Sequence, residues 1–186
     1  MRIVGGSLRG HRLAVPKSQN IRPTTDRVRE SLFNILDHSY GEFLENARVL
    51  DVFAGTGALG IEALSRGAEH VSFIELGDEA LKLLRQNVAA VKISSSTQIL
   101  KRDAIRPGSC GLIAPFGLVF LDPPYGKSLG EAALNALRTN TWLANNALVV
   151  LEEDSSSLPN AIEGFTFLER RDFGGTSIGL FHHTVS

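Results

Sequence analysis

The sequence predicts an α/β fold built on a parallel β-sheet, and three observations support this prediction. From Arg48 onward, short apolar runs alternate with amphipathic stretches, which is typical of strand–helix–strand units. Gly55, Gly57 and Gly60 form a G-x-G-x-x-G pattern directly after the first of these runs. Glu75 ends the next run, 20 residues after Gly55. A glycine turn and an acid in these places indicate the ligand-binding edge of an open, doubly wound sheet.

Apolar periodicity predicts the elements in chain order. Two short extended runs, 2–4 and 12–15, are separated by glycines and indicate a hairpin. A helix follows Thr24 or Thr25, either of which can cap it. Its apolar residues recur at helical spacing, at Val28, Leu32, Ile35 and Leu36. Further along, we expect strands over 49–53, 71–75, 97–100, 118–121 and 147–151, helices over 58–65, 78–91 and 130–138, and a closing hairpin of 165–171 with 177–182.

Composition sets the class of protein. The 186 residues are 43% hydrophobic, which suits one α/β domain with an appendage. Cys110 is the single cysteine, so an intrachain disulfide is excluded, and no cysteine–histidine cluster has zinc spacing. No signal-peptide pattern or apolar run of about 20 residues occurs. We therefore expect a cytoplasmic, monomeric protein without a metal or a membrane segment.

Charge is distributed unevenly along the chain. Residues 1–29 carry seven basic residues and one acidic residue, whereas the remainder carries 12 basic and 19 acidic residues. We predict a basic extension over 1–40, formed by the hairpin and the first helix, and a catalytic domain over 41–186. Arg27 and Arg29 lie near the start of that helix and are candidates for phosphate contacts. A solvated terminal segment is the alternative interpretation.

The glycine turn and Glu75 predict a nucleoside site, because the turn admits a ligand close to the backbone and the carboxylate can accept bonds from ribose hydroxyls. NAD sites share this spacing. Asp51 lies four residues before Gly55, and an acid there favours the cationic S-adenosylmethionine over an anionic pyrophosphate. Asp103 follows the third strand and can accept a bond from an adenine amino group; a solvated loop acid is equally consistent. The predicted cofactor-binding residues are Asp51, Phe53, Gly55, Gly57, Glu75, Asp103 and Ala104.

The most specific motif is Asp122-Pro123-Pro124-Tyr125, which follows an apolar strand. Two prolines remove two N–H donors, so the segment presents acceptors to its surroundings. An exocyclic amine on a base offers two N–H donors. The Asp122 carboxylate and the Pro123 carbonyl can bind both and make the nitrogen more nucleophilic. Tyr125 can stack on the base. We predict these four residues as catalytic; a rigid structural turn is the alternative.

Four segments together resemble the RsmD-type 16S ribosomal RNA guanine-N2 methyltransferases of bacteria. They are Arg2-Ile-Val-Gly-Gly, the run from Arg22-Pro-Thr-Thr to Glu-Ser-Leu-Phe33, Asp51 to Gly60, and Leu121-Asp-Pro-Pro-Tyr. The resemblance implies a Rossmann-like class I S-adenosylmethionine-dependent fold, with a mostly parallel seven-stranded sheet, an antiparallel last strand and helices on both faces. It also implies that the basic extension holds 16S ribosomal RNA within a partly assembled small subunit. The RNA-contact candidates are Arg22, Thr24, Arg27 and Arg29.

Other functions remain open on the residues alone. An adenine-N6 DNA methyltransferase or a protein glutamine methyltransferase uses a related proline turn. Glutamine enzymes of this type generally carry Asn where this chain has Asp122, and DNA enzymes often add a target-recognition domain for which 186 residues leave little room. A nucleic-acid binding module without activity is a further alternative. His182 and His183 have no predicted role, and we expect them to be solvated.

Overall fold

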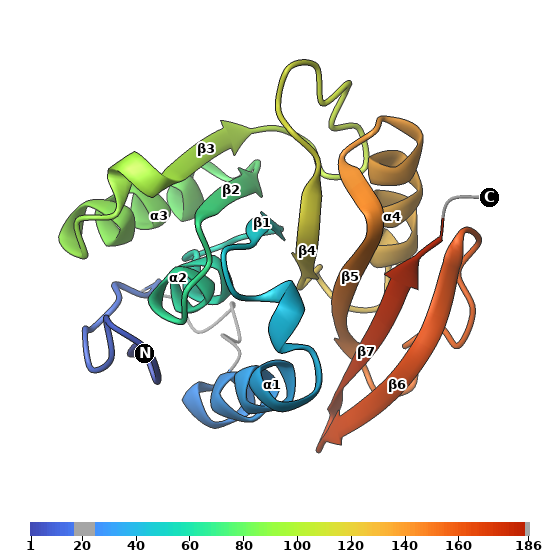
Figure 1. Ribbon diagram of the computed structural model, residues 1–186, viewed down its shortest axis with the longest axis horizontal. Coiled ribbons are helices and arrows are strands. Elements are labelled where there is room, and N and C mark those ends of the chain that lie inside the picture. The colour runs from blue at the N-terminus through green and yellow to red at the C-terminus, as the bar shows by residue number, and fades with distance from the viewer. Residues whose placement is uncertain (17–24, 185–186) are drawn as a thin grey trace.

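A computed structural model describes residues 1–16 and 25–184 (Figure 1). Its strands are β1 (Arg48–Val52), β2 (His70–Glu75), β3 (Thr97–Lys101), β4 (Phe116–Leu121), β5 (Leu143–Asp154), β6 (Phe165–Phe173) and β7 (Thr176–His183). Its helices are α1 (Asp26–Ser39), α2 (Ala58–Ser65), α3 (Asp78–Ala90) and α4 (Leu129–Thr139), with short 3₁₀ turns η1 (Gly41–Phe43) and η2 (Ser94–Ser96).

The strands form one seven-stranded sheet in the order β3-β2-β1-β4-β5-β7-β6. Neighbours from β3 to β5 are parallel, and β7 is antiparallel to both β5 and β6. The chain moves outward from β1 to β3 and then returns to place β4 on the other side of β1. The predicted Rossmann-like fold is therefore confirmed, and its topological switch point lies between β1 and β4, where such sheets bind ligands.

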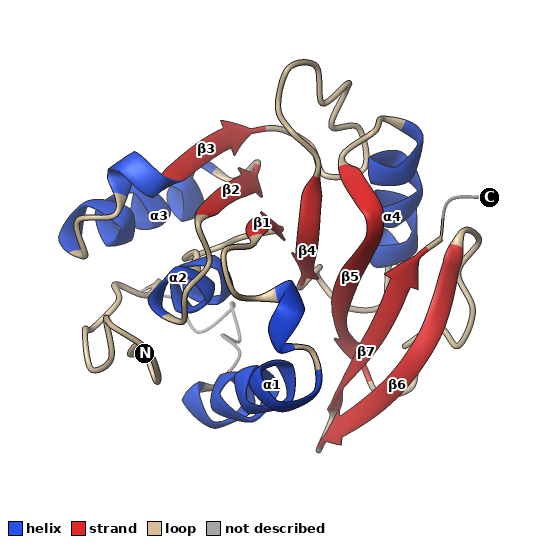
Figure 2. Ribbon diagram, viewed as in Figure 1, coloured by secondary structure: helices blue, strands red, loops and turns tan. Residues whose placement is uncertain are grey.

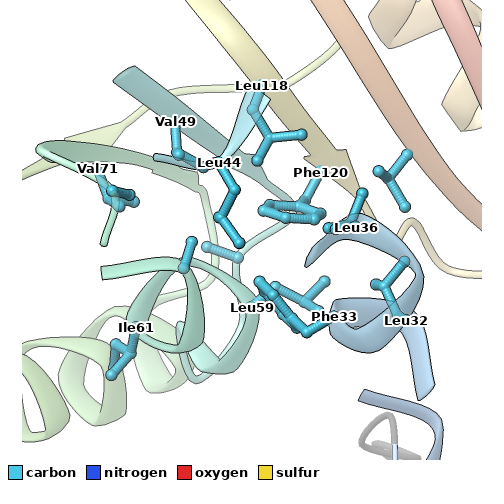
Figure 3. Packing of buried hydrophobic residues seen from close by; sticks show 14 of the residues in the cluster. Leu32, Phe33, Leu36, Leu44, Val49, Leu59, Ile61, Val71, Leu118 and Phe120 are labelled. Atoms are coloured by element: carbon cyan, nitrogen blue, oxygen red, sulfur yellow. The ribbon is translucent and has the colours of Figure 1, made fainter. Parts of the chain in front are cut away.

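Helices cover both faces of the sheet, as predicted (Figure 2). Leu32, Phe33 and Leu36 of α1 pack with α2, α3 and one face of the strands, and Phe33 lies 5.6 Å from the ring of Phe120 (Figure 3). Helix α4 packs with the other face through Ala133, Leu134 and Leu137. Burying side chains of this size contributes roughly 2 kcal/mol each, so the two cores hold the sheet, and with it the switch point, in a fixed position.

Helix α1 begins where the sequence predicts. The Thr25 hydroxyl caps it by accepting a hydrogen bond from the N–H of Val28 at 3.3 Å. Ile35 was predicted on the buried stripe, but it is only half-buried, and Phe33 is fully buried instead. The stripe is rotated because α1 meets both α2 and the sheet, so residues at 32, 33 and 36 all point inward.

The predicted hairpin forms within residues 1–16, where the N–H of Ile3 donates to the His11 carbonyl and that of Leu13 to the Met1 carbonyl, but it contains no regular strands. Its antiparallel pairing is a single bridge between Arg2 and Arg12. The N–H groups of Val4 and Gly5 donate instead to the carboxylate of Glu62 on α2, at 2.9 and 2.8 Å. Because α2 takes these donors, no ladder extends along the hairpin. Ile3 and Leu13 join the same core as α1, so the hairpin packs against the α/β domain.

Two further predictions differ from the structure. Strand β5 begins at Leu143, four residues before the predicted start at 147, and pairs across a register shift with β4. Asn146 within it has φ +60°, so the strand's first part lacks regular alternation. The expectation of solvated histidines is also wrong: His183 is buried, because its Nδ1 contacts the Ala144 carbonyl at 3.0 Å and its ring lies 5.5 Å from that of Phe165.

Candidate active site

The predicted site residues converge at the carboxyl ends of β1 to β4. Val52 of β1 is paired with Ile74 of β2 and with Leu121 of β4, so these three strands end at the same level. The N–H of Asp122 faces the Val52 carbonyl at 3.5 Å. The glycine turn (53–57), the segment after β2 and the Asp-Pro-Pro-Tyr loop (122–125) therefore leave the sheet side by side, at the switch point.

The glycine turn has an unusual backbone. Phe53, Gly55 and Gly57 have φ of +59°, +53° and +78°. A positive φ at a phenylalanine is strained, and such strain is concentrated at functional sites. A Cβ at Gly57 would lie 2.4 Å from Leu84 Cδ1, so α3 closes the space behind the turn. At Gly55 the nearest atom to such a Cβ is 3.9 Å away. The turn is thus supported from behind and open at Gly55, as a ligand cradle requires.

Glu75 joins the glycine turn to the end of β2. Its carboxylate accepts the N–H of Gly55 at 2.8 Å, and those of Leu76 and Gly77 at 2.8 and 2.7 Å. A carboxylate offers about four acceptor sites, so capacity remains for a ribose hydroxyl. Leu76, which the sequence reasoning missed, is 55% exposed beside it. An acceptor next to an apolar surface fits a nucleoside; the signal for Leu76 was its place directly after the strand's terminal acid.

Asp51 lies beneath the glycine turn and is 2% exposed. Its carboxyl accepts the N–H of Gly60 at 2.9 Å, which satisfies a donor in the first turn of α2 that has no side-chain cap. Burial raises the pKa of Asp51 to about 8, and the charge of Glu75 adds to the rise. A cation placed near this carboxyl would favour its charged form, which agrees with the predicted preference for a cationic ligand.

Replacing Asp51 with asparagine is expected to change the pH dependence of stability. Because the pKa of Asp51 is about 8 when folded and about 4 when unfolded, the folded protein holds the extra proton between these values. The wild-type free energy of unfolding should therefore fall with rising pH, by at most about 1.4 kcal/mol per unit. Asp51→Asn keeps an acceptor for Gly60 and should lack this component. Urea unfolding at several pH values between 5 and 7 measures it; identical slopes would contradict the assignment.

Asp103 and Ala104 follow β3 on the same edge. One Asp103 oxygen accepts the N–H of Ile105 at 3.1 Å, and the other pairs with the Arg106 guanidinium at 3.0 Å. Ala104 is buried in the core beside α4. The Arg106 contact was not foreseen. This contact fixes the carboxylate of Asp103. The hydrogen bond that this carboxylate is expected to accept from the adenine amino group stays a prediction.

The Asp-Pro-Pro-Tyr loop leaves β4 with Pro123 buried, Pro124 exposed, and Asp122 and Tyr125 half-buried. The Tyr125 hydroxyl donates to Glu152 on β5 at 2.7 Å and lies 3.3 Å from the Thr176 hydroxyl on β7. Burial raises the pKa of Tyr125 well above its usual range, and the charges of Glu152 and Asp122 contribute to the rise. Sequence reasoning missed Glu152 and Thr176; a pair of acids ending an apolar strand was the available signal.

The predicted RNA contacts divide into three groups. Arg22 and Thr24 lie outside the described residues. Arg27 is exposed on the first turn of α1 and remains a candidate. The N-terminal hairpin offers further exposed arginines that could contact RNA, at Arg2, Arg9 and Arg12.

The hairpin is held in place by Asn87 of α3, whose side chain forms hydrogen bonds with both the N–H and the carbonyl of Ala14 and with the Thr56 carbonyl. Asn87 therefore links the basic hairpin to the glycine turn.

The prediction that Arg29 contacts RNA is wrong. Its side chain is fully buried, and its guanidinium contacts Asp26 at 2.9 Å, Glu62 at 3.6 Å and the Arg2 carbonyl. The helix turns this position toward α2 because it shares the inward face with Leu32, Phe33 and Leu36. Arg29 consequently holds α1 and the hairpin against the domain and is not available to a phosphate.

The strand order, the glycine turn after β1 and the Asp-Pro-Pro-Tyr loop after β4 define a class I methyltransferase fold. The ribosomal protein L11 methylase from Lactobacillus delbrueckii shares this fold, with a TM-score of 0.64 and 18% identity over 83% of this chain and 77% of that one. Among the described residues, no helix combines the length and hydrophobicity that crossing a membrane requires.

The chain belongs to the family of RsmD-type proteins whose model, described as "Conserved hypothetical protein 95", matches residues 1–182. It is 37% identical over 182 residues to the Ribosomal RNA small subunit methyltransferase D of Escherichia coli strain K12, covering 97% of this chain and 89% of that protein. The solved structure of YhhF from E. coli superposes with a TM-score of 0.83, at 35% identity, covering 100% of this chain and 99% of that one.

Proposed function

We propose that this chain transfers a methyl group from S-adenosylmethionine to the exocyclic N2 amine of a guanine in 16S ribosomal RNA. The observation that carries the proposal is the position of the Asp-Pro-Pro-Tyr loop beside the glycine turn, on strands that end at the same level. Methyl transfer needs this adjacency, because donor and acceptor must meet in line. The name of the E. coli relative, at 37% identity, supports ribosomal RNA of the small subunit as the substrate class.

Acceptor groups on the loop would prepare the amine. The Asp122 carboxylate and the Pro123 carbonyl would each accept a hydrogen bond from one N–H group of the amine. The two successive prolines contribute no N–H donor that would compete for these acceptors. Positive charge on the attacking nitrogen is then stabilised by oxygen atoms held in advance. Tyr125 offers a ring for the base, and such stacking is worth roughly 1–3 kcal/mol per base. S-adenosylmethionine, when bound, supplies an electrophilic methyl group on a cationic sulfur.

The cofactor would be held by the residues predicted for it. The open backbone at Gly55 admits it, and Gly57 lets the turn pack closely against α3. Glu75 accepts a hydrogen bond from the ribose, and Leu76 presents an apolar surface to the purine. Asp51 and Phe53 shape the turn from below, and Asp103 and Ala104 border the adenine. The residues assigned to the cofactor are therefore Asp51, Phe53, Gly55, Gly57, Glu75, Leu76, Asp103 and Ala104.

Glu75→Ala is expected to weaken S-adenosylmethionine binding by about 10- to 100-fold while changing the transfer rate at saturating cofactor much less. The loss of affinity has two sources. The variant lacks the ribose contact, and the N–H groups of Gly55, Leu76 and Gly77 lose the acceptor that Glu75 provides in the wild type. Titration calorimetry measures the affinity. Glu79→Ala, at an exposed position of α3, is the control, and an unchanged affinity in Glu75→Ala would contradict the ribose contact.

The RNA would lie along the basic hairpin and Arg27. We propose a partly assembled small subunit as the substrate, because a base must leave its stack to reach the loop, and an exposed loop nucleotide avoids most of that cost. We propose that the enzyme works as a monomer. The anchoring of the hairpin through Asn87 would place bound RNA at the same edge as the cofactor.

The decisive experiment follows labelled methyl from S-adenosylmethionine to small-subunit RNA or particles that lack the modification, with nucleoside analysis of the product. N2-methylguanosine supports the proposal. Label in adenine of DNA, or in protein glutamine, would replace it with one of the alternatives, and absence of transfer to every acceptor would favour a binding module. Thermal stabilisation by S-adenosylmethionine but not by NAD, about 2.7 kcal/mol at 100 times Kd, tests the cofactor separately.

A further inference from the structure

Two successive glutamates of β5 hold the loop after β4 from both faces of the sheet. The Tyr125 hydroxyl donates to Glu152 at 2.7 Å, and the N–H of Gly126 donates to Glu153 at 3.2 Å. Side chains alternate along a strand, so Glu152 points to the face that carries α1 to α3, and Glu153 to the face that carries α4. Both are buried, with 6% and 3% exposure. Two consecutive residues of the loop are thus fixed in opposite directions.

A third contact comes from β7, whose first residue, Thr176, lies 3.3 Å from the Tyr125 hydroxyl. The phenol is therefore held by groups from two strands that follow the loop in sequence. Burying a carboxylate costs free energy unless it is hydrogen-bonded. A hydrogen bond from a hydroxyl group to a carboxylate is among the strongest hydrogen bonds in proteins. This contact restricts rotation of the ring far more than packing of a half-buried side chain would.

We propose that Glu152 is a positioning residue for the transfer reaction: through the Tyr125 hydroxyl it fixes the ring against which the target base lies. The proposal rests on the proposed function, because it gives the ring a base to hold. Asp122 is close enough for its charge to act on Tyr125, so the orientation of the ring and the acceptor of the amine are set within one small region. A misplaced ring would shift the base relative to that acceptor.

Two other roles for Glu152 are distinguishable from this one. If Glu152 contacted the base directly, its removal would slow transfer whether or not Tyr125 carried a hydroxyl. If Glu152 only stabilised the fold, its removal would lower the melting temperature and the affinity for S-adenosylmethionine without a specific effect on the transfer step. Positioning through Tyr125 requires that the effects of the two residues on the rate do not multiply.

The test is a double-mutant cycle on the full chain, with Glu152→Ala, Tyr125→Phe, the double variant and Glu152→Gln. Single-turnover methyl transfer, S-adenosylmethionine affinity and melting temperature are measured for each. We expect Glu152→Ala and Tyr125→Phe each to slow transfer by about 10- to 100-fold, and the double variant to be no slower than either. Glu152→Gln, which keeps an acceptor for the hydroxyl, should restore most of the rate. Glu163→Gln, at a side chain that is 86% exposed, is the charge-matched control.

A wild-type rate in Glu152→Ala, or multiplied losses in the double variant, would overturn the proposal. So would a loss of cofactor affinity that accounts for the slower transfer. If Glu152→Ala does not fold, Tyr125→Phe alone tests the proposal, because loss of the hydroxyl should slow transfer without lowering the cofactor affinity, and a wild-type rate in that variant would overturn it. A wild-type protein that methylates no RNA would refute the proposed function instead, whereas an active wild type with insensitive variants would refute only the role of Glu152.

Discussion

Asp122→Ala is expected to lower the rate of methyl transfer by about 10²- to 10³-fold while leaving S-adenosylmethionine affinity within about twofold of wild type. The carboxylate is the only charged acceptor within the 122–125 loop, and its removal takes away stabilisation that matters most as the nitrogen becomes positive. The glycine turn and Glu75 bind the cofactor through other strands, so they should be unaffected.

Single-turnover transfer and calorimetric titration on the same preparations separate the two quantities. Asp122→Asn is the matched control: it keeps one carbonyl acceptor but loses the charge, and it should fall between wild type and Asp122→Ala. Turnover of Asp122→Ala close to the wild-type rate would contradict the catalytic role assigned to this residue.

Glu62→Ala is expected to lower the free energy of unfolding by about 3–5 kcal/mol, the usual consequence of removing one partner from a buried ion pair. Glu62 is fully buried and accepts the N–H groups of Val4 and Gly5, and it contacts Arg66 at 2.9 Å and Arg29 at 3.6 Å. Without it, the two backbone donors lose their acceptor, and the buried guanidinium of Arg29 keeps Asp26 but loses a second carboxylate partner.

Denaturant unfolding measures the change. Glu62→Gln keeps one acceptor oxygen but loses the other and the charge, so its loss of stability should be smaller than that of Glu62→Ala. Glu69→Ala, at an exposed position after α2, should lie within about 0.5 kcal/mol of wild type. A Glu62→Ala protein as stable as Glu69→Ala would show that Glu62 does not stabilise the packing of the hairpin.

Local sequence signals were sufficient for most of the fold. Helix α2 has the predicted bounds of 58–65, because glycines precede it and its apolar face is continuous. The N-terminal hairpin could not be predicted in detail, because its donors pair with Glu62, which lies 58 and 57 residues away from Val4 and Gly5. Arg29 failed for a related reason: periodicity gives the faces of a helix but not what covers them, and the acids that neutralise Arg29 include Glu62 on another element.

For the candidate site, the residues that sequence reasoning found are those within short motifs, at Gly55, Glu75 and Asp122. The sheet brings all three to one edge. Sequence reasoning could not find the groups that support these motifs from other parts of the chain. Asn87 supports Thr56 from the last turn of α3, and Glu152 supports Tyr125 from 27 residues further along the chain. Asn87 lies in no recognisable pattern, and the acids that end β5 do not reveal which group they support, since these contacts join segments that meet only after folding.

Strand β7 runs opposite to its neighbours, and this direction has a consequence for how such enzymes can vary. Parallel strands deliver only their final residues to the reactive edge, each followed by a connection that must cross back over the sheet. A reversed strand delivers its first residue, here Thr176, immediately after the two-residue turn at Gly174 and Gly175. A substitution at Thr176 can therefore alter the surroundings of Tyr125 without lengthening any loop. The start of β7 is thus a position at which related sequences could differ while the sheet stays the same.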